Sequence, residues 1–354
     1  MCNIVGYVGN RRAAPILIEM MKKQEGFCGG YYTGIATLHE NKLYYAKVVG
    51  GVSDLLKNTD AESLPGTIGI MHSRSNSGGD KEWAHPFISC DEKMAYIANG
   101  SVGFFKKLIN INEVAQKLDQ EGYIFRSRCN EKIESYPVLS DGSSVHISEV
   151  MCHLIESYIN KGMNHAEAMR KSFMDYPSEI VGLMIHVSEM NAIFASRISM
   201  PMMIGHSSEA TYLSTTALAF PEDVEMNSIY ALPVNCTAAV YSNSIKIMPF
   251  DSPPAKVSNI LPWHGAYERI INLLNSDEKS YYGFEDLLQA TLPVWEKDEV
   301  LQQISQKDMM IYEILRTLYE NGNIVFGEVE KEGAFPGLKA VQKVVSKKHV
   351  QNVA

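Results

Sequence analysis

The sequence lacks most features that mark secreted, membrane-spanning or nucleic-acid-binding proteins. No apolar run approaches the about 18 residues of a membrane span, and the first residues lack the basic and apolar regions of a signal peptide. The six cysteines are scattered without a Cys-x-x-Cys pair, so neither a zinc site nor a disulfide framework is indicated. A net charge of −9 and a pI near 5.6 disfavour a nucleic-acid partner bound by charge. We therefore expect a cytoplasmic protein with reduced thiols, no membrane contact and no metal.

The length and the patterning predict two domains of an α+β protein. The 354 residues, 45% of them hydrophobic, are enough for a large core, and Asp251-Ser-Pro-Pro-Ala255 marks a change in composition. We place domains at 1–250 and 251–354. Short apolar and β-branched runs predict strands at 3–9, 34–39, 43–49, 67–72, 94–98, 180–187, 191–196, 201–204, 211–214 and 236–248. Helical spacing of apolar residues predicts helices at 13–24, 112–120 and 148–160, with a long polar loop at 126–147.

Helical patterns dominate the second domain. They predict helices at 266–275, 284–290, 297–321 and 338–346, and one short strand at 323–327. The smaller module is therefore expected to be mainly helical, with a winged-helix-like unit around 297–330. Because the chain is acidic, a docking surface for a separate subunit is favoured over a DNA-binding role.

Cys2 follows the initiator Met1 directly, and cysteine is small enough to permit removal of that methionine. Removal would leave one residue with both a thiol and a free α-amine, and an α-amine with a pKa of about 7.7–8.0 is a fair base at neutral pH. A nucleophile activated by its own N-terminal amine is an established solution in acyl transfer. Alone, a cysteine at the second position is equally compatible with chance.

Three further features lie at the ends of predicted strands. Arg74 can grip an α-carboxylate with its planar fork, although an isolated arginine more often pairs with an acid at the surface. Asn99 and Gly100 can direct a side-chain amide and a backbone N–H at one point, as in an oxyanion hole, although Asn-Gly is also a common hairpin turn. His85, between Trp83 and Pro86, can line a pocket or serve as a structural hydrogen-bond partner.

Together, these features occur in the order and spacing of a known family. The sequence resembles the class II glutamine amidotransferases, which are N-terminal-nucleophile hydrolases, and within them the glutaminase part of the glutamine–fructose-6-phosphate aminotransferases. The resemblance covers roughly 2–250. It rests on the segments Cys2-Asn-Ile-Val-Gly-Tyr7, Ala13-Ala-Pro-Ile-Leu-Ile-Glu19, Thr33-Gly-Ile-Ala36, Lys47-Val-Val-Gly-Gly-Val-Ser-Asp-Leu-Leu56, Gly66-Thr-Ile-Gly-Ile-Met-His-Ser-Arg74, Ala84-His-Pro86, Ala98-Asn-Gly100, Arg197-Ile-Ser-Met-Pro-Met-Met-Ile-Gly205 and Leu213-Ser-Thr-Thr-Ala-Leu-Ala219.

The resemblance implies a four-layer αββα sandwich, two antiparallel sheets between helices. It implies Cys2 as nucleophile with its α-amine as base, and Asn99 with Gly100 as oxyanion hole. It also implies that Arg74 binds the α-carboxylate of the substrate, glutamine. No cofactor is implied.

Several positions depart from the family pattern. After Arg74 the family has Trp-Ala-Thr-His-Gly, whereas this chain has Ser75-Asn-Ser-Gly-Gly79, in which Ser75 and Ser77 supply hydroxyl groups. The loop Cys28-Gly-Gly-Tyr-Tyr-Thr-Gly34 lacks the arginine and the Asp-Ser pair of the family. The aspartate that would hold the substrate's α-ammonium is also missing, and Asp141 is the nearest candidate.

The leading hypothesis is a glutaminase that cleaves the side-chain amide of glutamine and passes ammonia to a synthase or sugar-isomerase subunit on another chain, with amination of a sugar phosphate as the outcome. The alternatives are an amidohydrolase for another amide or γ-glutamyl compound, and a catalytically silent binding or regulatory homologue. A homo-oligomer is compatible with each of these hypotheses.

Overall fold

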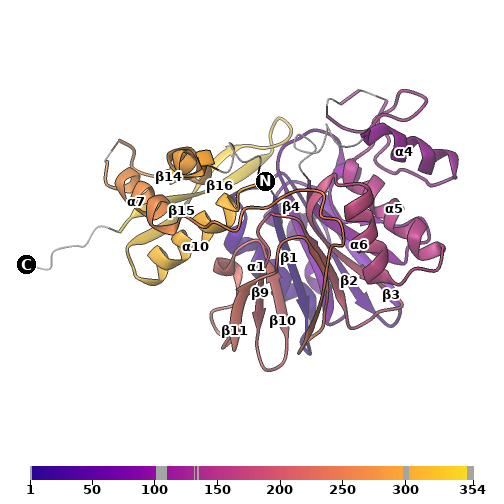
Figure 1. Cartoon of the computed structure of the whole chain (residues 1–354), viewed down its shortest axis with the longest axis horizontal. Helices are drawn as coiled ribbons and strands as arrows, with labels where there is room; N and C mark the ends of the chain where they lie inside the picture. The colour runs from indigo at the N-terminus through magenta and orange to yellow at the C-terminus, as the bar shows by residue number, and fades with distance from the viewer. Residues whose placement is uncertain are drawn as a thin grey trace, which may run out of the picture.

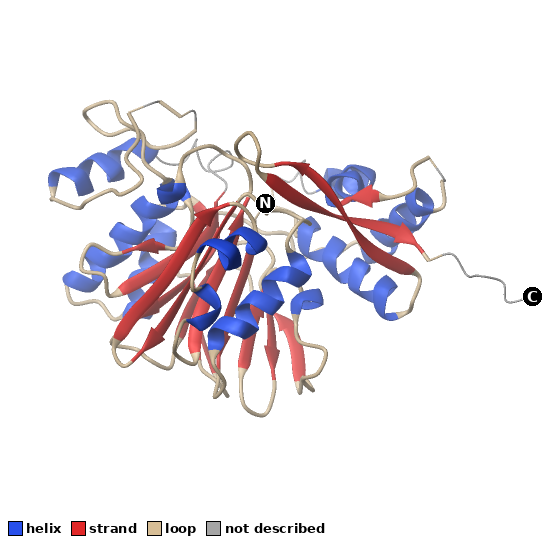
Figure 2. Cartoon of the chain, turned by 180° about the vertical axis from the view of Figure 1, so that it is seen from behind, coloured by secondary structure: helices blue, strands red, loops and turns tan. Residues whose placement is uncertain are grey.

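The computed structural model describes residues 2–100, 110–130, 132–133, 135–276, 278–297 and 303–348. Two antiparallel β-sheets lie face to face, with helices on both outer faces, and a smaller module of helices and strands lies to one side (Figures 1 and 2). The four-layer αββα sandwich expected from the sequence is therefore confirmed.

The first sheet has β1 at its centre, because the short apolar run after Cys2 is buried on both faces. β1 pairs antiparallel with β4 and with β10, and Asn3 lies opposite Ser73. In spatial order the strands are β11 (Ser228–Ala231), β9 (Met203–His206), β10 (Thr211–Ser214), β1 (Asn3–Val8), β4 (Ile68–Arg74), β2 (Tyr32–His39) and β3 (Lys42–Val49). This register sets the start of the chain beside the end of β4.

The second sheet places β6 near its edge, paired with β7 on one side and with the short β5 on the other. Its strands, in spatial order, are β13 (Ile245–Pro249), β12 (Cys236–Val240), β8 (Ile193–Arg197), β7 (Glu179–His186), β6 (Met94–Gly100) and β5 (Phe87–Ile88). Aliphatic side chains of both sheets, including Ile4, Ile70 and Leu183, form one buried layer between them.

Helices cover the outer faces of both sheets. The first sheet is covered by α1 (Ala13–Gln24) and α2 (Val52–Asn58), together with the short 3₁₀ helices η1 (Ala61–Ser63) and η3 (Ala217–Ala219). The second is covered by α5 (Ile147–Asn160) and α6 (His165–Asp175), with α4 (Ile111–Gln120) packed on α5. A further 3₁₀ helix, η2, spans Lys81–Trp83. The predicted strands and helices of this part are largely confirmed, but α2, α6, β5 and β11 were not predicted.

The single strand predicted at 236–248 is instead a hairpin of β12 and β13. The turn between them is closed by a hydrogen bond from the backbone N–H of Tyr241 to the carbonyl of Ser244. Between α4 and α5 the described residues form isolated bridges and no helix, in agreement with the predicted loop.

The C-terminal module contains three α-helices and a three-stranded sheet in the part that the structure describes. Its elements are α7 (Trp263–Leu274), β14 (Tyr282–Gly283), α8 (Phe284–Thr291), η4 (Leu292–Trp295), α10 (Lys307–Glu320), β15 (Ile324–Glu332) and β16 (Lys339–Lys347), and the sheet order is β14-β16-β15. The helix predicted at 338–346 is wrong, because this segment is β16. Within the predicted helix at 297–321, α10 covers Lys307–Glu320 and residues 303–306 are not helical, whereas 298–302 lie outside the described residues.

The module packs against the larger domain. Phe27 of that domain lies in the core of the module, where its ring meets Tyr312 edge to face at 5.7 Å. The guanidinium of Arg197 donates to the side-chain oxygen of Gln306 at 2.8 Å, and the ammonium of Lys343 donates to the carbonyl of Lys23 at 2.7 Å. These contacts attach α10, the residue before it and β16 to the larger domain. The division at residue 250 stays a prediction.

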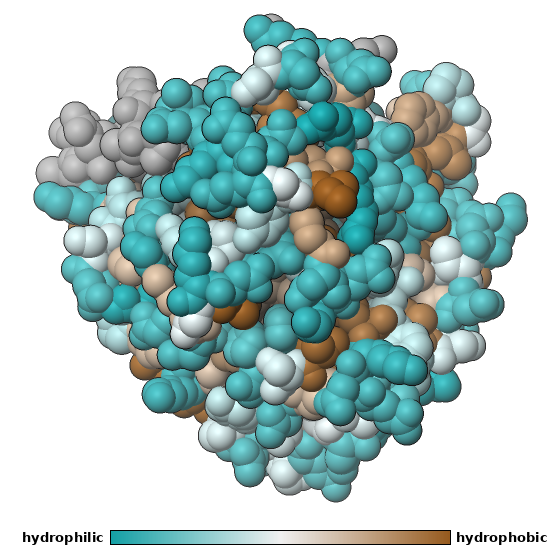
Figure 3. All heavy atoms as spheres, turned by 90° about the vertical axis from the view of Figure 1, so that its right-hand side faces the viewer, coloured by the Kyte–Doolittle hydropathy of each residue, from teal (hydrophilic) through white to brown (hydrophobic). Residues whose placement is uncertain are grey.

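None of the helices in the described part of the chain has both the length and the apolar character needed to cross a membrane. The face that carries α4, α5 and α6 is mostly hydrophilic, with hydrophobic side chains in small separate groups (Figure 3).

Candidate active site

A cavity of about 340 Å³ opens where β4, β6 and the first turn of α5 meet. Seven of the eight candidate residues from the sequence line it: Cys2, Arg74, Ser75, Ser77, His85, Asn99 and Gly100. Asp141 does not. Its carboxylate is half exposed and bonds to Arg128 at 3.2 Å and to the backbone N–H of Ser143 at 2.9 Å.

Two hydrogen bonds between the sheets hold the cavity together. His72 of β4 donates from Nε2 to the carbonyl of Ala98 on β6 at 3.0 Å. The amide of Asn99 donates from Nδ2 to the carbonyl of Cys2 at 2.9 Å. The ends of two strands from different sheets are thereby fixed around the start of the chain.

The thiol of Cys2 is the nucleophile candidate, and its surroundings favour the thiolate. Burial raises the pKa of Cys2, but hydrogen bonding to His72 and the charge of that ring outweigh burial and lower the pKa to about 6. The hydroxyl of Ser75 lies 3.8 Å from Sγ. At neutral pH the thiolate therefore predominates.

His72 was missed in the sequence analysis, although the sequence held a signal for it. His72 and Arg74 are two residues apart on β4 and therefore project to the same face of the sheet. With Nε2 bonded to Ala98, Nδ1 is the ring nitrogen of His72 that is left to act on the thiol of Cys2.

Arg74 is held by the loop that follows β4. Its terminal nitrogens donate to the hydroxyl of Ser77 at 2.7 Å and to the carbonyl of Gly78 at 2.6 Å, and the guanidinium lies 3.9 Å from the ring centre of Tyr32. Tyr136, which was not predicted, lines the cavity and donates its hydroxyl to Ser77 at 3.1 Å. The fork of Arg74 is thus stacked and fixed before any ligand binds.

Two neutral imidazoles border the same space. Burial lowers the pKa of His85 and of His146 well below the usual value, and the nearby charges of His72 and Arg74 act in the same direction. His146 caps α5 by accepting from the backbone N–H of Ser148 at 3.1 Å. Both nitrogens of His85 and Nε2 of His146 are buried without a hydrogen-bond partner in the described protein.

Further unpaired polar atoms border this cavity. Nε of Arg74 and Oδ1 of Asn99 are also buried without a partner in the described protein. Buried polar groups are almost always hydrogen-bonded, so such a concentration indicates a site completed by a polar ligand.

Asn99 and Gly100 lie at a bulge where β6 ends. An amide nitrogen carries two hydrogens, so Nδ2 of Asn99 keeps one for a ligand after bonding to Cys2. A Cβ at Gly100 would come within 2.6 Å of Oε2 of Glu179, so a side chain at this position would displace that carboxyl group.

Glu179 is the buried carboxyl group beside this bulge. It has no exposed surface, and neither oxygen has a hydrogen-bond partner within the described protein. Burial raises the pKa of Glu179 to about 8, so the carboxyl group is mostly neutral at pH 7. Nothing in the sequence distinguishes this residue at the start of a predicted strand.

Comparisons with known proteins relate the chain to aminotransferases that use glutamine. No family model matches the sequence. The chain is 28% identical over 222 residues to glutamine–fructose-6-phosphate aminotransferase [isomerizing] from Pyrococcus horikoshii, which covers 62% of this chain and 33% of the relative. The enzyme of the same name from Methanothermobacter thermautotrophicus is 31% identical over 235 residues, or 60% and 35% of the two chains. The chain thus spans about a third of the length of these relatives.

Among solved structures, glutamine phosphoribosylpyrophosphate amidotransferase from B. subtilis superposes with a TM-score of 0.59 at 16% identity, over 86% of this chain and 65% of that one. The allosteric regulatory enzyme of purine biosynthesis gives a TM-score of 0.57 at 17% identity, over 79% of this chain and 59% of that one. The chain is a homologue of the glutamine–fructose-6-phosphate aminotransferases and has the fold of the class II glutamine amidotransferases. In this amidotransferase fold the cavity lies around Cys2, at the N-terminal end of the central strand.

Proposed function

We propose that this chain is a glutaminase of the class II amidotransferase type, with Cys2 as the nucleophile. The observation that carries the proposal is the meeting, in one cavity, of a thiol with a lowered pKa, the Asn99–Gly100 bulge and the fixed guanidinium of Arg74. The homology to aminotransferases that use glutamine supports the substrate class.

The proposed reaction begins with attack of the Cys2 thiolate on the side-chain amide carbon of glutamine. The C–S bond forms, and the carbonyl oxygen becomes an oxyanion that accepts from the second hydrogen of Asn99 Nδ2 and from the N–H of Gly100. The amide nitrogen takes up a proton, the C–N bond breaks and ammonia leaves. Water then attacks the thioester, releasing glutamate and restoring the thiol.

The proton for the leaving nitrogen is assigned to the α-ammonium of Cys2, which exists only once Met1 has been removed. Met1 lies outside the described residues. An intact mass lower by one methionine is therefore required for the mechanism, and a full-length mass favours a catalytically silent homologue.

The substrate's charged groups are assigned to two residues of opposite character. Arg74 binds the α-carboxylate through its fork. Glu179 takes the place that the sequence assigned to Asp141, because its unpaired carboxyl group lies beside Gly100, whereas the carboxylate of Asp141 bonds to Arg128. An α-ammonium next to Glu179 would favour ionisation of that carboxyl group.

A different amide or γ-glutamyl substrate is the second candidate. The stretch after Arg74, whose Ser75 and Ser77 line the cavity, differs from the family pattern, and so does the loop of 28–34, whose Tyr32 stacks on Arg74. Measuring kcat/KM for glutamine, γ-glutamyl anilides and asparagine distinguishes a glutaminase from an enzyme for another amide or γ-glutamyl compound.

Labelling with diazo-oxo-norleucine, a glutamine-mimicking electrophile, tests the proposed function. We expect one label per chain, mapped to the peptide that begins at Cys2. The labelling rate should decrease as the pH falls through about 6, because the thiolate is then converted to the thiol.

In the variant His72→Gln the same decrease should occur at a higher pH, since the group that lowers the pKa of Cys2 is removed. Label on another cysteine, or a profile that His72→Gln does not move, contradicts the assignment.

We further propose that ammonia is used by a separate synthase or sugar-isomerase subunit that docks on the C-terminal module. Ile260, Leu261 and Trp263 expose between 40% and 48% of their surfaces in one short segment before α7. Exposed apolar residues that lie close together are typical of interaction sites.

The docking proposal predicts that Ile260→Asp with Leu261→Asp abolishes ammonia transfer. In an assay with fructose 6-phosphate and a separately expressed sugar-isomerase subunit from the same cell, hydrolysis of glutamine should persist while formation of the amino sugar is lost. Ile247→Asp, which changes a somewhat less exposed isoleucine on β13, is the control and should leave transfer intact. Transfer that survives the double substitution places the interface elsewhere.

A further inference from the structure

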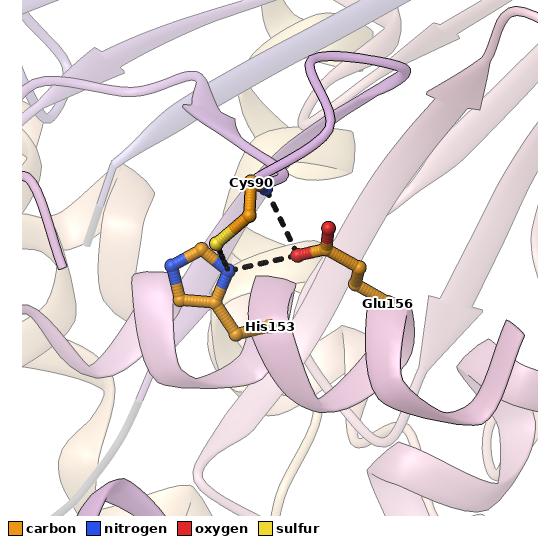
Figure 4. Close-up of side chains that lie close together, drawn as sticks. All are labelled: Cys90, His153 and Glu156. Atoms are coloured by element: carbon orange, nitrogen blue, oxygen red, sulfur yellow. Dashed lines mark hydrogen bonds and ion pairs between the residues drawn. The ribbon is translucent and has the colours of Figure 1, made fainter. Parts of the chain in front are cut away.

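A second cluster of reactive side chains lies outside the cavity, on the outer side of the second sheet. Cys90 lies in the turn between β5 and β6, and His153 and Glu156 lie one turn apart on α5 (Figure 4). Sγ of Cys90 is 3.7 Å from Nδ1 of His153, and that nitrogen is 3.1 Å from Oε2 of Glu156. All three ligand atoms lie within 4.8 Å of one another.

The backbone orients each of the three side chains. The N–H of Ile124 donates to Sγ of Cys90 at 3.3 Å, and its carbonyl accepts from Nε2 of His153 at 3.1 Å. The N–H groups of Cys90 and Asp91 donate to the two oxygens of Glu156 at 3.0 and 3.3 Å. Such outer contacts are those that fix the tautomer and the orientation of metal ligands.

The bond from Nε2 to Ile124 has a consequence for Nδ1. In a neutral imidazole with Nε2 protonated, Nδ1 carries a lone pair, and that lone pair faces a carboxylate oxygen and a sulfur. Three electron-rich atoms converge on one point, so a proton on His153 or on the thiol of Cys90, or a metal ion, must lie there.

We propose that Cys90, His153 and Glu156 bind one zinc ion, with a fourth coordination position left to water. With Zn–N and Zn–O bonds of about 2.0–2.1 Å and a Zn–S bond of about 2.3 Å, the ligand atoms of a tetrahedral site lie about 3.3–3.6 Å apart. The observed 3.7 and 3.1 Å are close to these edges. Thiolate, imidazole and carboxylate together suit zinc better than magnesium or calcium, which prefer oxygen ligands.

The alternative occupant is a proton. Burial lowers the pKa of His153, whereas the contacts with Cys90 and Glu156 raise it, to about 9 overall. An imidazolium paired with Glu156 would then hold the cluster together without metal. The two descriptions differ in zinc content and in response to chelators.

A zinc ion here would connect three segments of the second layer. It would join the turn after β5 and the segment at residue 124 to α5. The start of α5 in turn lines the cavity through His146 and Ser148. The metal would thus stabilise the fold and would not contact the reacting atoms. No local sequence pattern predicts this cluster, because Cys90 is 63 positions from His153.

Zinc binding is best measured in the variant Cys2→Ser, so that the thiol of the cavity cannot bind the metal. After treatment with a chelator, titration with zinc should give one bound ion per chain. Zinc should also raise the melting temperature. Cobalt substituted for zinc should give a thiolate-to-metal charge-transfer band.

Adding Cys90→Ser or, separately, His153→Gln to this background should weaken zinc binding about 100-fold, and Cys90→Ser, which removes the thiolate, should also remove the cobalt band. Cys129→Ser, which changes a half-exposed thiol outside the cluster, should change neither. Circular dichroism of each variant shows whether it folds. If Cys90→Ser does not fold, His153→Gln provides the test. No zinc binding in Cys2→Ser, or equal binding in all variants, overturns the proposal.

Discussion

Replacing Cys2 with alanine should abolish glutamine hydrolysis while leaving the fold intact. Removal of a catalytic nucleophile in hydrolases typically lowers kcat by about 10⁴-fold or more, and a loss of at least about 10³-fold is expected here. Alanine is as small as cysteine for the purpose of methionine removal, so the α-amine is still formed. The substitution therefore removes the thiol and keeps the α-amine, so it measures the contribution of the thiol alone. Ammonia release from glutamine is the measurement.

The fold should survive because the thiol of Cys2 is only partly buried and packs in no hydrophobic cluster among the described residues. Cys129→Ala is the matched control, since this thiol is also half exposed and lies outside the cavity. It should keep full activity. A Cys2→Ala protein that melts like the parent and still hydrolyses glutamine would remove the thioester mechanism from consideration.

The central strands and the site at their ends could be predicted from local sequence. Residues 3–8, 68–74 and 94–100 are short, largely apolar runs that are nearly fully buried, so the pattern alone identifies them. The polar residues at the ends of these runs, such as Arg74 and Asn99, then stand out. Strand ends are where a rigid sheet presents side chains to a ligand.

The rest of the site depends on tertiary contacts that no local pattern encodes. Tyr136 reaches the cavity from a loop, His146 is there because it caps α5, and Glu179 lies beside Gly100 because β7 pairs with β6. Asp141 was chosen for its closeness in sequence to α5, but its carboxylate instead bonds to Arg128 at the surface. Nearness along the chain does not carry a side chain into a pocket.

The error at 338–346 has a different cause. Val341, Val344 and Val345 have helical spacing, yet the segment pairs with β15 over nine residues and with β14 at its end. Short apolar runs fit both the helical and the strand periodicity. β-Branched residues favour the strand once a neighbouring strand is available for pairing. The long pairing with β15 decides the outcome.

Arg74→Lys should weaken binding of glutamine severely while sparing substrates that lack an α-carboxylate. Lysine keeps the charge but cannot form two parallel bonds, and it cannot stack on Tyr32 as the planar guanidinium does. A hydrogen bond to a charged group contributes about 1.5–3 kcal/mol, so the KM for glutamine should rise by about 10- to 100-fold. The α-amide of glutamine, which has no α-carboxylate, should react at nearly the parental rate.

Arg197→Lys is the matched control, because Arg197 is equally buried but bonds to the carbonyl of Met200 and to Gln306 instead of lining the cavity. That variant should have a lower melting temperature. The ratio of its activity on glutamine to its activity on the α-amide should be unchanged. If Arg74→Lys instead reduces activity on both substrates equally, its contacts with Ser77 and Gly78 support the loop, and Arg74 does not bind the substrate.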